Sequence, residues 1–428
     1  MNTTHHIAKE GQTFKAHPGS FINKPLAFLC ALALSPVWLV NAGTSALRRD
    51  TVTQTNLKID ALGRQVKVSH FTNGYMKSSA AVWDILKGKM AFVGASINHT
   101  LDYQSQEKIL STYNVLPGLT SLQDVHSRIG LENIDAHELM NKQLSGSVFS
   151  TLGICFKAFL NNVCFDSGVL AESKTVPLFG LQLNNVSMKR AVDWVVSNKP
   201  LNSNCPAKRI QTTTNVTYFI NAHSINTMAK NESFSACLQR ADALFADGSG
   251  VRLAAKSEGF GLVSNLNGTD MLPKICDSAA QQGKSIFLLG GAPGIAEKAA
   301  ANLQDTHRGL KVAGTHHGFF GFDDAQASSD MVNKINESGA DIVLVGFGSP
   351  HQEFWSERFA EELHCQSILA VGGLFDFYSG AIPRAPLLLR EVGMEWVWRL
   401  LQEPKTKFKR YVIGTPEFLI RTYILRNV

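Results

Sequence analysis

Asp247 is the residue whose type and position best suit acid–base chemistry. It directly follows the apolar run ALFA and precedes Gly248 in the segment ALFADGSGVRLAA (243–255). Ligands of open α/β sheets bind outside the carboxyl ends of the strands, where a carboxylate can act as a general base toward a hydroxyl group. A helix N-cap would explain the same aspartate. Asn221 ends the run VTYFI in a similar way and is either a sugar-binding residue or a turn residue.

Glycine pairs end two further apolar runs, Gly290-Gly291 in SIFLLGGAPG and Gly372-Gly373 in AVGGLFDF. Backbone amides at a strand–helix turn of this kind suit a diphosphate. Glycines that recur at strand ends also indicate a ligand lying close against the backbone. A tight turn in any α/β protein would explain the same pattern, because the full GxGxxG motif is absent from the sequence.

The segment VLVGFGSPHQEFWSERF (343–359) is more specific. Its apolar run ends in a glycine-rich turn that contains Ser349, and Gln352 and Glu353 then open a helix. The amide donors of that helix start are expected to face the same sheet edge as Asp247. We therefore expect this turn to contribute to the same site.

The elements that must position these residues form a regular alternation. From Pro177 onward, apolar runs such as SIFLLGG and DIVLVGFGS alternate with helix-like stretches such as 294–304 and 352–363. Strands that are apolar throughout, each followed by a turn and a helix, indicate a parallel sheet covered on both faces. The sequence predicts an α/β fold, with a Rossmann-like parallel sheet and flanking helices in the C-terminal half, preceded by a smaller α-rich membrane-associated module.

The chain is long enough for two modules with appendages, because 428 residues exceed one ordinary core. The expected division is a flexible N-terminus (1–24), a front module (25–174), a catalytic domain (175–383) and a basic aromatic C-terminal appendage (384–428).

The C-terminal appendage is locally basic. Residues 384–428 hold nine Lys or Arg against four Asp or Glu, and so supply five of the six net positive charges. Six aromatic residues are interleaved with these charges, a combination typical of the surface of an anionic membrane. Nucleic acid is not expected, because no nucleic-acid-binding motif accompanies the charge. An ordinary surface helix is the remaining alternative.

The front of the chain carries one apolar run, Pro25–Val40, interrupted by Pro36. No window reaches the ~18 uninterrupted apolar residues that a spanning helix needs, so we expect this run to be too short to cross a bilayer as a straight helix. It could dip into one leaflet or pack as a core helix. With the basic residues ahead of it, the run also superficially resembles a secretory signal.

Seven cysteines are scattered, without a CxxC pair or a Cys/His cluster at metal-ligand spacing. The catalytic half also lacks an Asp-x-Asp motif. We therefore expect no metal and no cofactor.

Several motifs occur together in a fixed order: NAHSIN, ADGSGV, NGTDML, IFLLGG, HHGFF, GSPHQE, VGGLFDFYSG, RAP and GMEWVWRLLQEPKTKFKRY. Over about residues 177–415 this order and spacing resemble the WecG/TagA/CpsF glycosyltransferases, glycosyltransferase family 26. By this resemblance Asp247 is the catalytic base, Asn221 an active-site asparagine and Gln352 the glutamine of the GSPKQE motif.

The resemblance also implies a reaction and a place. It implies an inverting transfer of a sugar, such as N-acetylmannosamine, its uronic acid or glucose, from a UDP-sugar to a polyprenyl-diphosphate-linked glycan in bacterial polysaccharide biosynthesis. The expected place is the cytoplasmic face of the bacterial inner membrane, where the appendage docks on the anionic surface and completes the active site. A homo-oligomer is compatible with the sequence.

Two departures from the family pattern affect the donor phosphates. Asn265 stands where the family usually has arginine, and His351 replaces the usual lysine. Arg252, Arg384 or Arg390 would then have to hold the phosphates, or activity is reduced. The expected substrate-binding residues are Gly248, Asn265, Asp270, Gly290, Gly291, Ser349, Glu353, Gly372, Gly373, Arg384 and Arg390.

The front half is similar to bacterial polyprenyl-phosphate sugar-phosphate transferases, through VWDILKGKMAFVG and VLPGLTSLQDVHSR. Lys77 and Ser78 occupy the positions of the catalytic Asp-Glu pair in that family, so the resemblance implies a degenerate module kept for membrane attachment. A non-catalytic scaffold of a polysaccharide assembly complex is the alternative function for the whole chain. A dinucleotide oxidoreductase is disfavoured, since no acidic ribose-binding residue follows the glycine turn at the expected distance.

Overall fold

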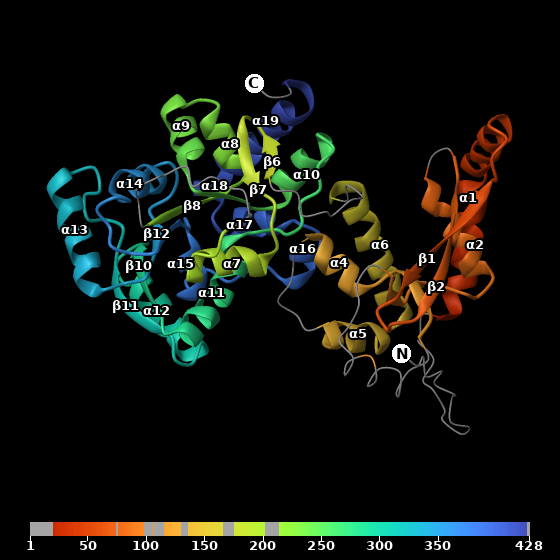
Figure 1. The fold of residues 1–428 in the computed structure, drawn as a ribbon, viewed down its shortest axis with the longest axis horizontal. Helices are drawn as coiled ribbons and strands as arrows, with labels where there is room; N and C mark the ends of the chain where they lie inside the picture. The colour runs from red at the N-terminus through yellow and green to blue at the C-terminus, as the bar shows by residue number, and fades with distance from the viewer. Residues whose placement is uncertain are drawn as a thin grey trace. The chain divides into compact units, whose positions relative to one another are not determined.

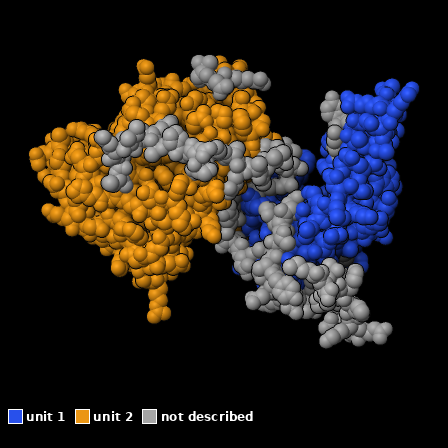
Figure 2. All heavy atoms as spheres, in the orientation of Figure 1, with its two compact units in different colours: residues 1–127, 133–162 blue, residues 128–132, 163–428 orange. Residues whose placement is uncertain are grey.

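The chain forms two compact units in the computed structural model, which describes residues 20–73, 76–97, 115–129, 136–165, 175–201 and 214–425 together with Gln106. Unit 1 comprises residues 1–127 and 133–162, and unit 2 comprises residues 128–132 and 163–428 (Figure 2). Each unit is described by itself below.

A six-stranded parallel sheet forms the centre of unit 2 (Figure 1). Its strands lie in the order β11-β10-β12-β13-β8-β9. Their bounds are β8 (Asn215–Ile220), β9 (Ala243–Ala246), β10 (Ser285–Gly290), β11 (Lys311–His316), β12 (Ile342–Gly346) and β13 (Ser367–Ala370). Most of these strands are buried along their whole length, as expected for a parallel sheet covered on both faces. The predicted α/β fold with a Rossmann-like sheet is confirmed.

Helices cover both faces of this sheet. Residues of β12 alternate between two apolar clusters, with Ile342 and Leu344 in one and Val343 and Val345 in the other. The covering helices are α7 (Met188–Ser197), α8 (Ala222–Met228), α9 (Glu232–Arg240), α10 (Ser249–Ser257), α11 (Gly268–Gln282), α12 (Ile295–Thr306), α13 (Ala325–Ser338), α14 (His351–Phe359) and α15 (Leu374–Tyr378). An antiparallel hairpin of β6 (Thr175–Leu178) and β7 (Leu181–Asn184) precedes them.

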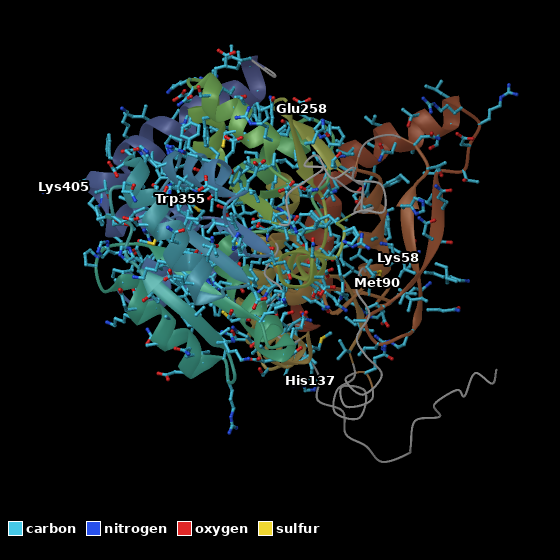
Figure 3. All side chains as sticks on the ribbon, turned by 60° about the vertical axis from the view of Figure 1, so that its left-hand side comes forward. Lys58, Met90, His137, Glu258, Trp355 and Lys405 are labelled. Carbon is cyan, nitrogen blue, oxygen red and sulfur yellow. The ribbon has the colours of Figure 1, made fainter. Side chains whose placement is uncertain are left out.

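The C-terminal appendage is a chain of short helices: α16 (Leu387–Glu391), α17 (Glu395–Gln402), α18 (Pro404–Phe408), the π-helical segment η2 (Lys409–Ile413), α19 (Gly414–Ile420) and the π-helical segment η3 (Arg421–Leu425). Phe418 of α19 is fully buried in one of the two clusters that cover the sheet, with its ring 6.0 Å from that of Phe179. In Figure 3, Trp355 lies among the crowded side chains of unit 2, whereas Lys405 of the appendage lies at the edge. The appendage is therefore packed into the core at one end and open at its basic surface.

Unit 1 combines helices with two small sheets. Its elements are α1 (Ser20–Leu47), β1 (Thr53–Ile59), β2 (Gln65–Phe71), the 3-10 helix η1 (Lys77–Ala80), α2 (Ala81–Leu86), β3 (Ala91–Val93), β4 (Ala95–Ser96), β5 (Pro117–Thr120), α4 (Leu122–Ile129), α5 (Ala136–Leu144) and α6 (Val148–Phe165). Strands β1 and β2 form an antiparallel pair, and β3, β5 and β4 form a parallel sheet.

The length of α1 corrects one prediction from the sequence. The helix has 28 residues, with Pro25 and Pro36 inside it, and its segment Phe21–Leu47 is long and apolar enough to cross a membrane by length and composition. The sequence predicts only the apolar run Pro25–Val40, whereas the helix extends beyond both ends of this run and continues through polar residues such as Asn23 and Asn41. Both asparagine side chains are buried against the rest of unit 1, so the helix can continue through them although they interrupt the apolar sequence.

Candidate active site

Asp247 and Asn221 lie side by side at the carboxyl ends of β9 and β8. The two strands are parallel, with Ile220 opposite Ala246, so the next residue of each strand emerges at the same point. Asn221 Nδ2 donates to Asp247 Oδ2 over 3.3 Å. The N-cap interpretation of Asp247 is wrong, because Gly248 occupies the N-cap position of α10.

Asn221 has a second task at the start of α8. It is the N-cap residue, and its Oδ1 accepts hydrogen bonds from the backbone amides of His223 at 3.0 Å and Ser224 at 3.1 Å. The Ser224 hydroxyl is placed to accept from the backbone amide of Asn221, which completes a capping box. With Oδ1 fixed in this way, the amide group of Asn221 is oriented toward Asp247.

The surroundings of Asp247 suit a base that works near neutral pH. Burial raises the pKa of this carboxyl from its ordinary value to about 6, and the negative charges of Glu395 and Asp270 add to the effect. The hydrogen bond from Asn221 and the positive charge of Arg410 act in the opposite direction. A general base is most effective when its pKa lies close to the working pH.

Arg410 brings a cation from the appendage to this end of the sheet. It belongs to η2, and its guanidinium lies 5.5 Å from the ring centroid of Tyr411. The Arg410 Nε is buried and finds no hydrogen-bond partner among the residues described. Burial lowers the pKa of His223 to about 4, and the charge of Arg410 is the next largest cause. Arg410 therefore lies within electrostatic reach of both α8 and Asp247.

Asn265 occupies a structural position beside the candidate base. Its Oδ1 accepts from the backbone amide of Gly248 over 2.8 Å. Gly248 has a φ of 89°, a conformation that favours glycine, and a Cβ there would meet no neighbouring atom. Where the family usually has an arginine, this chain thus has an amide that fixes the loop directly after Asp247.

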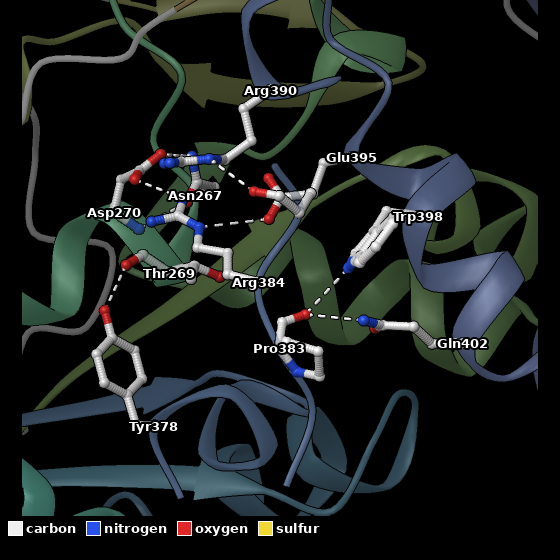
Figure 4. A network of polar contacts seen from close by, with 11 residues as sticks. Asn267, Thr269, Asp270, Tyr378, Pro383, Arg384, Arg390, Glu395, Trp398 and Gln402 are labelled. Atoms are coloured by element: carbon white, nitrogen blue, oxygen red, sulfur yellow. Dashed lines mark hydrogen bonds and ion pairs between the residues drawn. The ribbon is translucent and has the colours of Figure 1, made fainter. Parts of the chain in front are cut away.

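Arg384 is paired with protein groups (Figure 4). Its Nη2 lies 2.6 Å from Asp270 Oδ1 and its Nε lies 3.4 Å from Glu395 Oε1. Asn267 Nδ2 donates to Asp270 Oδ2 over 2.7 Å, so Asp270 links the start of α11 to the appendage. These contacts hold the appendage in place, and the expected substrate-binding role of Arg384 and Asp270 stays a prediction.

Arg390 also has a protein partner, since its Nε donates to the backbone carbonyl of Ala385 over 3.1 Å. Burial, followed by the charge of Arg384, lowers the pKa of Arg390. Arg252, the third candidate for the donor phosphates, is buried in α10.

Gln352 connects the turns after β12 and β13. Its Oε1 accepts from the backbone amides of Gly372 at 2.9 Å and Gly348 at 3.3 Å. Its Nε2 donates to Glu353 Oε1 over 2.9 Å, and the Ser349 hydroxyl donates to the same oxygen over 2.6 Å. Burial raises the pKa of Glu353. The predicted residues of the GSPHQE segment thus form one cluster, with Gln352 and Glu353 buried and Ser349 half-buried, and its hydrogen bonds position the turns.

Glycine is required for different structural reasons at the ends of β10, β12 and β13. A Cβ on Gly290 would lie 2.4 Å from the carbonyl oxygen of Gly346, and a Cβ on Gly346 would lie 2.6 Å from that of Gly372. Gly291 has a φ of 71°, and its Cβ would lie 2.9 Å from the side chain of Ile295. Gly290 and Gly346 therefore allow neighbouring strand ends to pack, which the sequence interpretation of a ligand against the backbone did not foresee.

Gly372 and Gly373 differ again. Gly372 has a φ of 60° and open space where a Cβ would be, whereas a Cβ on Gly373 would lie 3.0 Å from Asp376 Oδ2 and 3.2 Å from Arg399 Nη2. Arg399 Nη2 donates to Asp376 Oδ2 over 3.2 Å, a second link between the appendage and a strand end.

The topology has a switch point between β10 and β12. From β10 the chain runs to β11 on one side, whereas from β12 it runs to β13 on the other. Ligands of open α/β sheets bind at such a switch point, outside the carboxyl ends of the strands. At ~4.8 Å per strand, this switch point lies roughly 17 Å from the end of β9. An elongated ligand could therefore reach from the glycine turns to Asp247.

The model of the glycosyl transferase WecG/TagA/CpsF family matches residues 176–427, more than half of the chain. The chain belongs to this family. It is therefore a transferase of the glycosyltransferase type, with a role in polysaccharide biosynthesis, a sugar donor and a glycan acceptor. Because the match begins at residue 176, the resemblance of the front half to sugar-phosphate transferases stays a prediction.

The WecG/TagA/CpsF segment also contains groups that we did not predict. Arg410, Tyr411 and Glu395 lie in the appendage. The charges of Arg410 and Glu395 shift the pKa of Asp247 in opposite directions. Burial raises the pKa of Tyr411, and the charge of Asp247 adds to this rise. The only sequence signal for them was the density of basic and aromatic residues, which did not single out any one position. Among the described residues, no group of three or more His, Cys, Asp or Glu could hold a metal ion.

Proposed function

We propose that unit 2 transfers a sugar from a UDP-sugar to the hydroxyl of a polyprenyl-diphosphate-linked glycan, with inversion at the anomeric carbon. The observation that carries the proposal is the Asn221–Asp247 pair at the carboxyl ends of β8 and β9, with Arg410 of the appendage nearby. Family membership supplies the reaction class, and the pair supplies a base with a raised pKa.

In this mechanism Asp247 takes the proton from the acceptor hydroxyl. The oxygen then forms a bond to the anomeric carbon while the bond from that carbon to the UDP oxygen breaks, and UDP leaves with the electron pair. Asn221 keeps the Asp247 carboxylate in position through its 3.3 Å hydrogen bond. Proton removal by a positioned base of this kind contributes roughly 10²–10⁴-fold to rate.

The charge of the leaving diphosphate needs donors close to the reacting carbon. Arg410 is a suitable cation, because its charge already acts on Asp247 and its Nε has no partner among the described residues. Backbone amides in the turns after β10 and β12 would hold the rest of the diphosphate, since such donors cost little reorganisation. Arg384 serves this site indirectly, by fixing the appendage to Asp270.

Membrane attachment would bring this site to its lipid-linked acceptor. The appendage exposes apolar side chains, including Leu401, Phe408 and Ile413, among the basic residues Lys405 and Lys409. Apolar and cationic groups on one surface suit an anionic leaflet. We place the enzyme at the cytoplasmic face of the bacterial inner membrane, where UDP-sugars are made.

The front module, residues 25–174, is proposed as an attachment module without phosphoryl-transfer chemistry. Lys77 and Ser78 stand where a related enzyme would need its two carboxylates, and neither group can act as a carboxylate nucleophile. Incubation of the full chain with UDP-sugars and polyprenyl phosphate should therefore release no UMP. Release of UMP would contradict this part of the proposal.

The decisive experiment is a UDP-release assay on the purified full chain. A panel of UDP-sugars is tested with and without membrane lipid extract that contains polyprenyl-diphosphate-linked glycan. We expect one donor to give UDP release that depends on the acceptor, together with a lipid product enlarged by one sugar. If no donor gives acceptor-dependent release, the transferase proposal fails and the scaffold function becomes the better explanation.

A further inference from the structure

Helix α1 runs beside α2 in unit 1 (Figure 1), and one of its faces contacts the body of that unit at several points. At its start, Asn23 Oδ1 accepts from the backbone amide of Phe92 over 3.0 Å. In its second half, Trp38 Nε1 donates to Ser79 Oγ over 2.9 Å, and Asn73 Nδ2 donates to Ser45 Oγ over 3.4 Å. One face of α1 is thus fixed to protein from Asn23 to Ser45.

The part of unit 1 that contacts α1 includes a small β-sheet, which cannot lie in the hydrocarbon core of a bilayer. Asn23 and Ser45 are separated by roughly 33 Å at ~1.5 Å per helical residue, about the thickness of the hydrocarbon core. Strand β2 packs beside α2 on this body and pairs with β1 in a two-stranded sheet, so among the residues that the structure describes β1 has an open edge. Open sheet edges do not occur at membrane depth. If α1 crossed a bilayer, this body would have to enter with it.

The opposite face of α1 is apolar and exposed, with Phe28, Leu29, Leu32 and Leu39 among its residues. The helix contains no Asp or Glu. Positive charges lie at its two ends, Lys24 at one and Arg48-Arg49 at the other, and all three residues are exposed. An apolar stripe between cations is the pattern of a helix that lies in the plane of an anionic membrane surface.

A second stripe of the same kind runs along α6. Phe149, Leu152, Phe156 and Phe159 are all exposed, and their spacing of three, four and three residues places them on one helical face. The helix has no Asp or Glu, and Ile154 on its other face is buried in a core cluster.

Two observations place the two stripes next to each other. Phe92 packs against both the cluster that contains Ala27 of α1 and the cluster that contains Ile154 of α6. Burial raises the pKa of the Cys155 thiol of α6 to about 11, and the next largest cause is Cys30 of α1, which must therefore lie nearby. Both cysteines are half-buried, at the border between the packed and the exposed face of their helix.

We propose that the exposed faces of α1 and α6 form one surface on which unit 1 rests flat on an anionic bilayer, with α1 along the membrane and not across it. This proposal is independent of the sugar chemistry of unit 2. A lipid surface fits better than a second copy of the chain, because the exposed charges that flank the α1 stripe (Lys24, Arg48, Arg49 and Asp50) are net positive and would repel their equivalents in a copy.

The first test measures binding of the full chain to sealed vesicles that contain anionic lipid. High salt suppresses the electrostatic contribution of the appendage, so the remaining binding reports apolar contact. We expect Phe28→Glu and Phe156→Glu each to weaken binding at high salt by roughly tenfold or more. Leu57→Glu in β1 is the matched control and should bind as the wild type does, since Leu57 is 60% exposed, compared with 58% for Phe28 and 61% for Phe156.

The second test determines whether α1 crosses the membrane. Inside-out inner-membrane vesicles are prepared from bacteria that express the full chain with one tag ahead of Met1 and another after Val428. A helix that lies on the surface leaves both tags on the same side, so external protease should remove both.

Three outcomes would overturn the proposal. Protection of the N-terminal tag would show that α1 crosses the membrane. Equal binding of Phe156→Glu and Leu57→Glu would show that α6 does not contact lipid. Self-association without lipid that Phe156→Glu abolishes would show that a second copy covers this face.

Discussion

The two halves of the sheet edge in unit 2 end in different kinds of residue. Strands β8 and β9 end in polar side chains, Asn221 and Asp247, joined by a hydrogen bond. Strands β10 and β12 end in glycines that pack backbone against backbone. Moving a proton requires a side chain whose pKa can be tuned, whereas holding a diphosphate requires accessible amides. Under the proposed function, proton transfer and donor binding would therefore be separated along one edge.

The appendage reinforces this division because it contacts the two halves in different ways. Near β9 it contributes the charges of Arg410 and Glu395, which act on Asp247. Near β13 it contributes Arg399, which donates to Asp376 and holds a turn in place. The following variants test the separation, beginning with the largest expected effect.

Asp247→Asn should leave the fold intact and lower kcat by roughly 10²–10⁴-fold, because the proposed general base is removed. Donor binding should persist, since the glycine half of the edge is unchanged. Single-turnover kinetics and equilibrium binding of the UDP-sugar would measure the two effects separately. Asp323→Asn changes an exposed carboxylate and serves as the control. Full activity of Asp247→Asn would remove Asp247 from the mechanism.

Gly346→Ala should instead act on stability. The added Cβ would lie 2.6 Å from the carbonyl oxygen of Gly372, which is backbone and cannot rotate away. We expect unit 2 to lose about 1–3 kcal/mol in its free energy of unfolding. Denaturant unfolding provides the measurement. Gly153→Ala in α6, where a Cβ meets no atom within 4 Å, is the control and should not destabilise its unit. An unchanged midpoint for Gly346→Ala would contradict the close packing of the strand ends.

Arg410→Gln should lower kcat/KM by about 10–100-fold, the usual effect of losing one hydrogen bond to a charged group. Its positive charge lowers the pKa of Asp247, so its removal should also shift the acidic limb of the pH–rate profile to higher pH. The neighbouring Lys409→Gln, which changes an exposed residue, should leave both properties unchanged. If the two variants behaved alike, Arg410 would have no special position.

Asp247→Asn should also stabilise the folded chain near neutral pH. Burial raises the pKa of Asp247 to about 6, so the folded state holds the proton more tightly than the unfolded chain does. The stability that this provides is fully present below the unfolded pKa of ~3.9 and is lost as pH rises through about 6.

Asparagine does not ionise, so the variant should gain about 1–2 kcal/mol over the wild type at pH 7.5, a figure reduced because Asp247 is only partly enclosed. Unfolding curves at several pH values would measure the difference, which should shrink toward pH 4. A difference that does not change with pH would show that Asp247 is not perturbed.

Much of unit 2 could be predicted from the sequence because its signals are local. Runs such as SIFLLGG predict both a strand and the residue at which it ends, and parallel strands bring those ends to one edge of the sheet. The adjacency of Asn221 and Asp247 follows from that rule. Family motifs added Gln352, Ser349 and Glu353, which do form one cluster.

The remaining features depend on tertiary contacts that no local pattern contains. The packing of Gly290 against Gly346 involves residues far apart in the chain, and so does the pairing of Arg384 with Asp270. Arg410 could not be distinguished from the other cations of the appendage, since only the path of the chain brings it near Asp247. The full length of α1 does not follow from the apolar run Pro25–Val40, because only the burial of Asn23 and Asn41 shows why the helix continues through polar residues.

Phe418 follows all six strands of the sheet in the chain, yet it is fully buried in the core of unit 2. A ribosome releases the N-terminal parts of a chain first, and domains fold as they emerge. Unit 1 can therefore be folded, and resting on lipid as proposed, while α19 is still inside the ribosome. Each new molecule would stay inactive until the appendage has left the ribosome, and a premature stop codon in the appendage would leave an attached but inactive product.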